Sequence, residues 1–364
     1  MFLNINMHIK PLNQPECWTL RRVKREIALP PVFGKELTMQ QLMDNFHRKF
    51  EYLRLSITDE CNFKCNYCLP DGYQRTHEKQ FLSETEIKNL VTAFAELGTK
   101  KVRITGGEPG LRKDFPSIIS TVSNTPGIIK VATTTNGFNL KKNAQHWFDA
   151  GLNAINVSVD SLDAKTFHLI TGKNIFQKVM DGVDAASQAG FSQVKINSVL
   201  MKGLNDNNLE LFIDWIKKQP IQLRFIELMQ TGDNSDFFEK YHISGQSIKD
   251  KLLGAGWIQK VRSSHDGPAQ VFTHPDCLGE IGLIMPYSKN FCENCNRLRV
   301  SSLGRLHLCL FGEEGIELRD LLSSPDDKEK LKARIVASLG DKKISHYLAL
   351  GQTGGTPHLA SIGG

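Results

Sequence analysis

Short strand-like runs alternate with amphipathic helical stretches between Glu51 and about Met229. The predicted strands are Tyr52–Thr58, Lys101–Thr105, Ile128–Thr135, Ala154–Asp160, Gln193–Leu200 and Gln222–Met229. One predicted helix begins at Ser83, with Glu86 three residues later as a capping box. Others cover about residues 114–123, 142–150, 176–189 and 207–217. Repeated strand–helix units predict a parallel sheet with right-handed crossovers.

The predicted strands are apolar on one face and polar on the other. Leu53, Leu55 and Ile57 alternate with Arg54, Ser56 and Thr58, and later strands repeat the pattern. A sheet covered by helices on both faces would be apolar on both, and a closed eight-stranded barrel would fill its interior with branched apolar side chains. The pattern therefore predicts an α/β fold, an incomplete (β/α)6 TIM-type barrel. Its polar lumen would contain Arg54, Arg103 and Lys195.

The regular alternation fades beyond about Gly232. Residues 233–265 have a helical pattern with loops, and short strand-like runs follow at 270–273, 279–284, 297–301 and 305–310. A helical stretch, Leu318–Leu339, and a glycine-rich tail end the chain. We expect three parts: an extension over residues 1–50 with local helix near Met39–Phe50, a partial barrel over 51–265, and a smaller α+β region over 266–364.

Composition describes an ordinary globular chain of 364 residues, 40% hydrophobic and 23% charged. The sequence contains no apolar run of membrane-spanning length and no pattern of a signal peptide. We therefore expect a cytoplasmic protein without a membrane partner. The net charge of +6 permits an anionic ligand but does not indicate a nucleic-acid partner.

Six of the eight cysteines fall into two groups of three. The first group, Cys61, Cys65 and Cys68, has the spacing C-x3-C-x2-C just past the first strand. Thiolates suit zinc or an iron–sulfur cluster, and a structural zinc site needs four ligands. The nearest histidine, His77, lies nine residues past Cys68. Three thiolates favour a cluster with one open iron, with zinc as the alternative.

The second group, Cys292, Cys295 and Cys309, has the spacing C-x2-C-x13-C. We expect His307, two residues before Cys309, to lie on the opposite face if this run is a strand. Again there are three ligands and an open position, and zinc remains an alternative. Arg297 and Arg299 would share one face, where they could bind an anion or line a solvated strand edge.

Several motifs resemble those of a known family. C-x3-C-x2-C with Tyr67 before the last cysteine resembles the signature of radical S-adenosylmethionine enzymes, and Thr105–Pro109 resembles their GGEP motif. From about Glu51 to Gly364 the chain resembles the GTP 3′,8-cyclases of molybdenum cofactor biosynthesis. The motifs are LRLSITDECNFKCNYCLP, RITGGEP, TTTNG, SVDSLD, ITG, VKIN, FIELM, GPA and FCENCNRLRVSS…CLFG.

The resemblance implies a lyase that uses two [4Fe-4S] clusters and S-adenosylmethionine. A 5′-deoxyadenosyl radical would remove the 3′ hydrogen of GTP, and the ribose radical would add to C8 of guanine. Reduction would give (8S)-3′,8-cyclo-7,8-dihydroguanosine 5′-triphosphate. The family's chemistry also implies an electron donor and hand-over of the product to cyclic pyranopterin monophosphate synthase. We expect a monomer or a homodimer.

The resemblance also assigns residues. The six cysteines of the two groups would be the metal ligands. S-adenosylmethionine contacts would come from Tyr67, Gly107, Glu108, Ser158 and Met229. Substrate contacts would come from Arg54, Arg103, Thr134, Lys195, Arg297, Leu298 and Arg299, of which Arg54, Lys195 and Arg297 would be catalytic. The terminal Gly363-Gly364 pair would reach the active site, although His358–Ile362 before it departs from the family's Met-Ser pair.

Two other functions are compatible with parts of the pattern. Another radical S-adenosylmethionine enzyme with an auxiliary cluster would usually carry more cysteines near the C-terminus than the three present here. A zinc-stabilised nucleic-acid-binding module would place basic and aromatic residues outside the sheet, whereas the alternation places the basic residues inside.

Overall fold

The computed structural model describes residues 41–74, 80–232, 234–261, 267–312, 314–355 and 359–363. The chain divides into two units, Met1–Thr38 and Met39–Gly364. The first unit lies outside the described residues, and so does most of the predicted extension. All that follows concerns the second unit.

One sheet of twelve strands runs through the described residues, in the order β12-β11-β10-β1-β2-β3-β4-β5-β6-β9-β8-β7. The six predicted barrel strands are β1 (Tyr52–Ser56), β2 (Lys101–Thr105), β3 (Lys130–Thr135), β4 (Ala154–Ser158), β5 (Gln193–Leu200) and β6 (Gln222–Glu227). The others are β7 (Ile258–Gln259), β8 (Gln270–Thr273), β9 (Glu280–Ile284), β10 (Arg297–Val300), β11 (Arg305–His307) and β12 (Ile316–Glu317).

Strands β1 to β6 are parallel, and the C-terminal region extends them at both edges. β10 pairs in parallel with β1, and β9 pairs in parallel with β6. Antiparallel partners then complete each edge. Because β12 and β7 are the two ends of the strand order, the sheet is an open barrel in the part of the chain described. The predicted incomplete barrel is confirmed.

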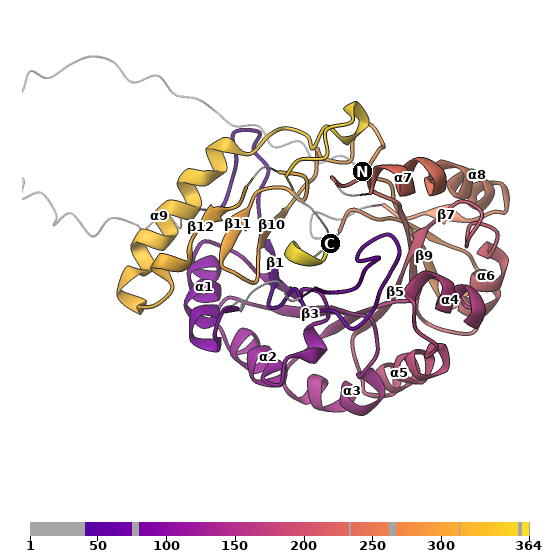
Figure 1. Cartoon of the computed structure of the whole chain (residues 1–364), viewed down its shortest axis with the longest axis horizontal. Helices are drawn as coiled ribbons and strands as arrows, with labels where there is room; N and C mark the ends of the chain where they lie inside the picture. Colours follow the sequence, from indigo (N-terminus) through magenta and orange to yellow (C-terminus); the bar gives the residue numbers. More distant parts are fainter. Residues whose placement is uncertain are drawn as a thin grey trace, which may run out of the picture. The chain divides into compact units, whose positions relative to one another are not determined.

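Helices α1 to α6 cover the outer side of the curved sheet (Figure 1). The helices are α1 (Glu84–Glu96), α2 (Phe115–Ser123), α3 (Leu140–Asp149), α4 (Ala164–Thr171), α5 (Phe176–Gln188), α6 (Leu209–Ile216), α7 (Ser235–Tyr241), α8 (Gln246–Gly254) and α9 (Lys328–Ser338). The predicted capping box is present, since Ser83 Oγ accepts from Glu86 N at 3.2 Å and Glu86 returns a bond to Ser83 N at 2.8 Å. Helix α4 was not predicted.

Two predicted helices are wrong in part. Residues 41–50 form a tight turn, with a bridge between Met43 and Lys49, because Asp44 accepts from the backbone N–H groups of Phe46 and Arg48. The helix predicted over Leu318–Leu339 is reduced to α9, preceded by the 3₁₀ turns Arg319–Leu321 and Pro325–Asp327. Pro325 cannot donate a helical hydrogen bond, so the helix begins after it.

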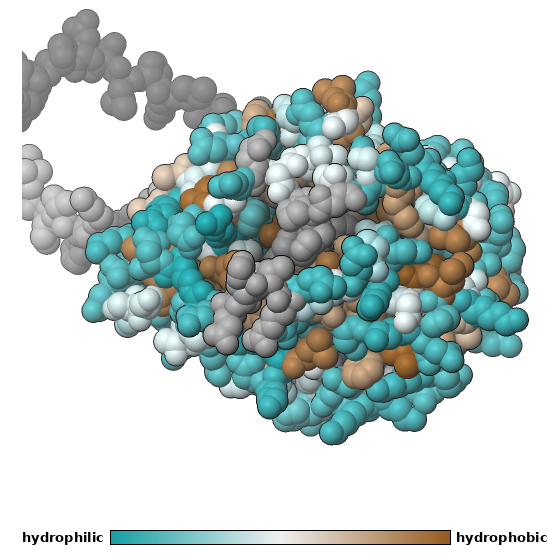
Figure 2. All heavy atoms as spheres, viewed as in Figure 1, coloured by the Kyte–Doolittle hydropathy of each residue, from teal (hydrophilic) through white to brown (hydrophobic). Residues whose placement is uncertain are grey.

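The two faces of the sheet have the character that the alternation predicts. Leu53, Leu55 and Ile57 are fully buried against the helices, and Arg54 lies on the opposite face. The face of the molecule in Figure 2 is mostly hydrophilic, with hydrophobic residues in separate patches. No described helix is long and apolar enough to span a membrane.

Candidate active site

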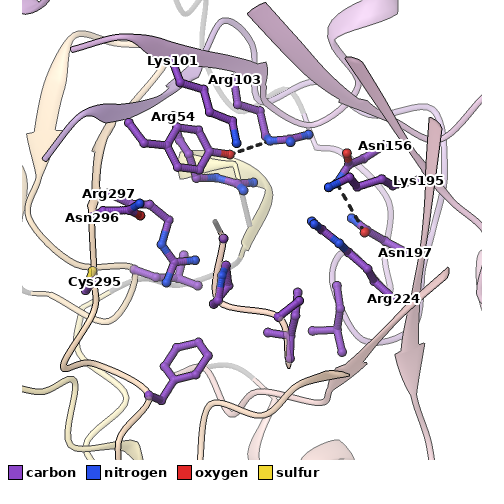
Figure 3. Close-up of a pocket in the computed structure, with 18 of the residues that line it drawn as sticks. Arg54, Lys101, Arg103, Asn156, Lys195, Asn197, Arg224, Cys295, Asn296 and Arg297 are labelled. Atoms are coloured by element: carbon purple, nitrogen blue, oxygen red, sulfur yellow. Dashed lines mark hydrogen bonds between the residues drawn. The ribbon is translucent and has the colours of Figure 1, made fainter. Parts of the chain in front are cut away.

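A cavity of about 780 Å³ lies on the polar face of the sheet. Arg54, Arg103 and Lys195 all line it, as the alternation predicts, and Figure 3 shows their side chains directed toward one central space. The basic lining residues are Arg54, Lys100, Lys101, Arg103, Lys130, Lys195, Arg224, Lys260, Arg297 and Arg299. The acidic ones are Glu51 and Glu280. This excess of cations suits a polyanionic ligand.

Strand register brings three of these arginines side by side. In the parallel ladders, Arg54 of β1 pairs with Arg299 of β10 on one side and with Arg103 of β2 on the other. Arg103 donates to the Tyr52 hydroxyl at 2.6 Å, to the Thr133 carbonyl at 2.9 Å and to Thr134 Oγ1 at 3.2 Å. The hydroxyl of Thr134, a predicted substrate contact, is thus held by Arg103.

The crowding of cations shifts the pKa of two neighbours. Burial would raise the pKa of Tyr52, but the charges of Arg103, Arg54 and Lys101 outweigh it and lower that pKa to about 6. Burial, together with the nearby charges of Arg224 and Arg103, lowers the pKa of Lys195 to about 5. Without a ligand, the positive charge of the cavity is therefore reduced by a Tyr52 phenolate and a neutral Lys195 amine.

The C-terminal tail docks inside the barrel beside β1 (Figure 1). The Gly363 carbonyl accepts from Arg54 at 2.8 and 3.1 Å and from Arg299 at 2.5 Å. Gly363 has φ of +67°, and a Cβ there would lie 2.0 Å from Thr105 Cγ2. Only glycine fits this position, because both the backbone conformation and the space exclude a side chain.

The first cysteine group lies in the loop after β1. Cys61, Cys65 and Cys68 are partly exposed, and Tyr67 donates to Asp160 Oδ2 at 3.1 Å. Burial raises the pKa of Cys61 to about 11 and that of Cys68 to about 12, and the thiolates repel one another. Iron would supply the missing positive charge, so three thiols in one loop fit an iron–sulfur cluster.

A zinc site is not preformed in the part of the chain that the structure describes. No three His, Cys, Asp or Glu side chains there converge closely enough to hold a metal ion. A structural zinc ion needs four ligands at about 2.0–2.3 Å around one point. The same observation applies to any metal ion, so it does not separate zinc from an iron–sulfur cluster.

The predicted GGEP turn follows β2. Gly107 has no room for a side chain, because a Cβ would lie 2.2 Å from the Glu60 carbonyl oxygen. The buried Glu108 carboxylate accepts from Thr135 Oγ1 at 2.8 Å, Asn136 N at 2.6 Å and Gly110 N at 2.9 Å. Burial raises its pKa to about 7. Glu108 thus ties the end of β2 to the end of β3, and its contact with a ligand ammonium stays a prediction.

The second cysteine group lines the basic cavity. Cys292, Cys295 and Cys309 all border it, and Arg297 lies beside Cys295 in Figure 3. Burial would raise the pKa of Cys295, but the charges of Arg297 and Lys342 lower it to about 7. These thiols fit a second cluster that faces the cavity. The prediction that His307 and Cys309 lie on opposite faces is wrong: positions two residues apart share one face of a strand, and both residues line a smaller cavity of about 280 Å³.

Comparison with known proteins gives the family. Residues 55–216 match the radical SAM superfamily, and residues 221–348 match the molybdenum cofactor synthesis C family. The chain is 77% identical to the GTP 3′,8-cyclase of Psychromonas ingrahamii over 339 residues, 93% of this chain and 100% of that protein. It is 60% identical to that of Aeromonas hydrophila, over 92% of this chain and 99% of that protein. This chain belongs to the GTP 3′,8-cyclase family.

A solved structure supports the fold of this cyclase-family chain. The crystal structure of Streptococcus suis SuiB is similar with a TM-score of 0.51 and 14% sequence identity. The similarity covers 78% of this chain and 68% of that one. At this identity it shows the fold alone.

Not all of the residues that the family resemblance assigns line the basic cavity. Those that do are Arg54, Arg103, Lys195, Met229, Cys292, Cys295, Arg297, Arg299 and Cys309. Those outside its lining are Cys61, Cys65, Tyr67, Cys68, Gly107, Glu108, Thr134, Ser158 and Leu298. The Leu298 side chain is buried in the hydrophobic core, so only its backbone is available to a substrate. The roles of these residues stay predictions.

Several residues that line the cavity of this cyclase-family chain were not among the predicted site residues. Lys101 lies two residues before Arg103 on the same face of β2, and Arg224 lies on β6 opposite Asn197 of β5. Figure 3 shows both directed into the central space, Lys101 beside Arg103 and Arg224 beside Lys195. Both lie within predicted strands, Lys101–Thr105 and Gln222–Met229, and the period-2 alternation applied to every residue of these strands would have found them.

Substitution of Gly363 by alanine tests the docking of the tail. We expect the tail to leave the barrel, because the added Cβ overlaps Thr105, and the C-terminus to become more sensitive to carboxypeptidase. Gly340 is the control, since a Cβ there meets nothing within 4 Å. A tail as protected in Gly363→Ala as in the unaltered chain would contradict the docking.

Proposed function

We propose that this chain is a radical S-adenosylmethionine GTP 3′,8-cyclase. It is a lyase that converts GTP to (8S)-3′,8-cyclo-7,8-dihydroguanosine 5′-triphosphate in molybdenum cofactor biosynthesis. The observation that carries the proposal is one cavity with ten basic residues on its walls and three clustered cysteines at its border. A polyphosphate and a metal-bound base could occupy such a cavity together. The near full-length cyclase relatives support the same function.

Cys61, Cys65 and Cys68 would hold a [4Fe-4S] cluster with one open iron for S-adenosylmethionine. When bound, this cofactor pair supplies a 5′-deoxyadenosyl radical that removes the ribose 3′ hydrogen of GTP. Tyr67, Gly107, Glu108, Ser158 and Met229 would surround S-adenosylmethionine. The absence of space at Gly107 supports backbone contact there, and Glu108 would act by holding the adjoining turns.

The triphosphate would bind among Arg54, Arg103 and Lys195, together with Lys101 and Arg224. Arginine forks and lysine ammonium groups are well suited to phosphate oxygens, and the cavity supplies both. Thr134 is held by Arg103 at 3.2 Å, so it would orient that arginine as well as contact the nucleotide.

The guanine base would lie toward the second cysteine group. Cys292, Cys295 and Cys309 would hold a second [4Fe-4S] cluster with its open iron facing the base. Arg297, Leu298 and Arg299 follow in β10, with Arg297 and Arg299 bordering the cavity. Arg54, Lys195 and Arg297 would stabilise charge on the reacting nucleotide, and the docked tail would exclude water from the space beside Arg54 and Arg299.

An electron donor would reduce the first cluster, and cyclic pyranopterin monophosphate synthase would take up the product. The chain would act in the cytoplasm, where GTP is available, as a monomer or a homodimer. A division of function near residue 265 is supported by the separate cysteine groups on either side of it.

Cys309→Ala separates the two proposed clusters. Anaerobic reconstitution should give about eight irons in the unaltered chain and about four in the variant. The variant should still release 5′-deoxyadenosine from S-adenosylmethionine and dithionite, but it should no longer consume GTP. Cys277→Ala is the matched control, since Cys277 lies outside both groups.

Two outcomes would contradict this assignment. Unchanged cyclisation by Cys309→Ala would remove the second cluster from the mechanism. If the unaltered chain cleaves S-adenosylmethionine but leaves GTP intact, another radical enzyme with an auxiliary cluster is the better function. A chain that holds zinc and no iron would favour the binding module.

GTP binding should take up protons at pH 8. Tyr52 is a phenolate and Lys195 a neutral amine in the ligand-free cavity, with pKa values of about 6 and about 5. A bound triphosphate offsets the surrounding cations and adds negative charge, so both pKa values rise and both groups gain a proton. We expect uptake of between about one and two protons and weaker binding as pH rises.

Calorimetry in two buffers of different ionisation enthalpy measures this uptake. Tyr52→Phe and Lys195→Met should each reduce it, because each removes one of the two groups. Lys289→Met, on a lysine outside the cavity lining, is the control. Proton release, or uptake unaffected by both substitutions, would contradict the assigned protonation states.

A further inference from the structure

The turn just before β1 contains a buried ion pair. Arg48 and Asp44 are only 6% and 0% exposed in their side chains, and Arg48 Nε donates to Asp44 Oδ2 at 2.7 Å. Burying both charges is costly unless they are paired and their other polar atoms are satisfied. Neither residue lines the basic cavity, so the proposed chemistry does not account for this pair.

The guanidinium of Arg48 reaches two distant segments. Its Nη1 donates to the Cys292 carbonyl at 3.2 Å and to the Ile344 carbonyl at 2.8 Å, and its Nη2 donates to the Lys343 carbonyl at 2.7 Å. These partners lie 244, 296 and 295 residues away along the chain. The planar fork of arginine can hold three carbonyls at once, which a lysine ammonium on a flexible stem cannot match.

Both segments belong to the surroundings of the second cysteine group. Ser345 Oγ donates to Cys292 Sγ at 3.8 Å. The neighbouring Lys342 is buried and donates from Nζ to the Leu308 carbonyl, one residue before Cys309. Arg48 therefore holds both the peptide group of Cys292 and the peptide group that joins Ile344 to Ser345, the donor to the Cys292 sulfur.

Asp44 holds the Arg48 side chain in its orientation. Its Oδ1 accepts from Phe46 N at 3.0 Å and Arg48 N at 2.9 Å, while Oδ2 accepts from the guanidinium. The turn is anchored by buried Leu42 and Phe50, and Leu42 N donates to the Leu97 carbonyl at 3.3 Å. Arg48 is thus presented in a fixed position by a turn attached to α1.

We infer that Arg48, oriented by Asp44, is a positioning residue for the second iron–sulfur cluster. It fixes the Cys292 loop and the 343–346 segment, so that the thiolate and its hydrogen-bond donors keep their places. Hydrogen bonds to a ligating sulfur help to retain a cluster and tune its potential. The inference rests on the second cluster of the proposed function.

The test isolates the second cluster. In a full-length chain with Cys61→Ala, Cys65→Ala and Cys68→Ala, any iron bound belongs to the second group. Adding Arg48→Lys keeps the charge but loses the fork, and we expect roughly 10-fold weaker iron retention against a chelator. The electron paramagnetic resonance spectrum of the reduced cluster should also change. With all cysteines present, Arg48→Lys should lower the iron content from about eight toward about four.

Arg319→Lys is the matched control. Arg319 also joins a carboxylate to a backbone carbonyl, through Glu86 and Gln80, but contacts neither cysteine group. It should lose stability without a selective loss of second-cluster iron. If Arg48→Lys does not fold by circular dichroism, Asp44→Asn replaces it, because it weakens the orientation of Arg48 while retaining the turn.

The outcomes separate this inference from the proposed function. A triple-cysteine variant that holds no iron with Arg48 intact would overturn the second cluster itself. A triple variant that holds about four irons, and holds them equally well with Arg48→Lys or Asp44→Asn, would overturn the inference and leave the cyclase function standing.

Discussion

Three arginines side by side on neighbouring strands impose the constraint around which this molecule is built. Arg299, Arg54 and Arg103 lie in register on β10, β1 and β2, on strands about 4.8 Å apart. Like charges at that separation repel, and the hydrocarbon core behind them offers no compensation. The chain supplies oxygen atoms instead, from Gly363, Tyr52 and Thr133. The remaining positive potential is available to a polyanion.

This row of arginines explains why the tail and the second cysteine group belong to the same centre. β10 begins two residues after Cys295, so its pairing with β1 brings that group to the wall of the barrel. The Gly363 carbonyl bridges Arg54 and Arg299. The tail therefore contacts the arginines of both β1 and β10 at the wall of the cavity.

Buried charge is used in two different ways. In the cavity the cations are left in excess, which gives the site the positive charge that a polyanion needs. At Asp44 and Arg48 each charge is paired, and the surplus donors of the guanidinium hold backbone carbonyls. The first arrangement favours binding, and the second gives rigidity to a loop that carries a proposed cluster ligand.

The sequence by itself determined the open barrel, the cations of its lumen and the two cysteine groups. Period-2 alternation and cysteine spacing are local properties, readable within a few residues. Tertiary structure alone decided that β10 pairs with β1 and that the tail docks on Arg54, which is 309 residues away along the chain. It also decided that Glu108 holds its neighbouring turns and that residues 41–50 form a turn rather than a helix. These depend on contacts between distant segments and on the competition of side chains for backbone N–H groups, which no local period encodes.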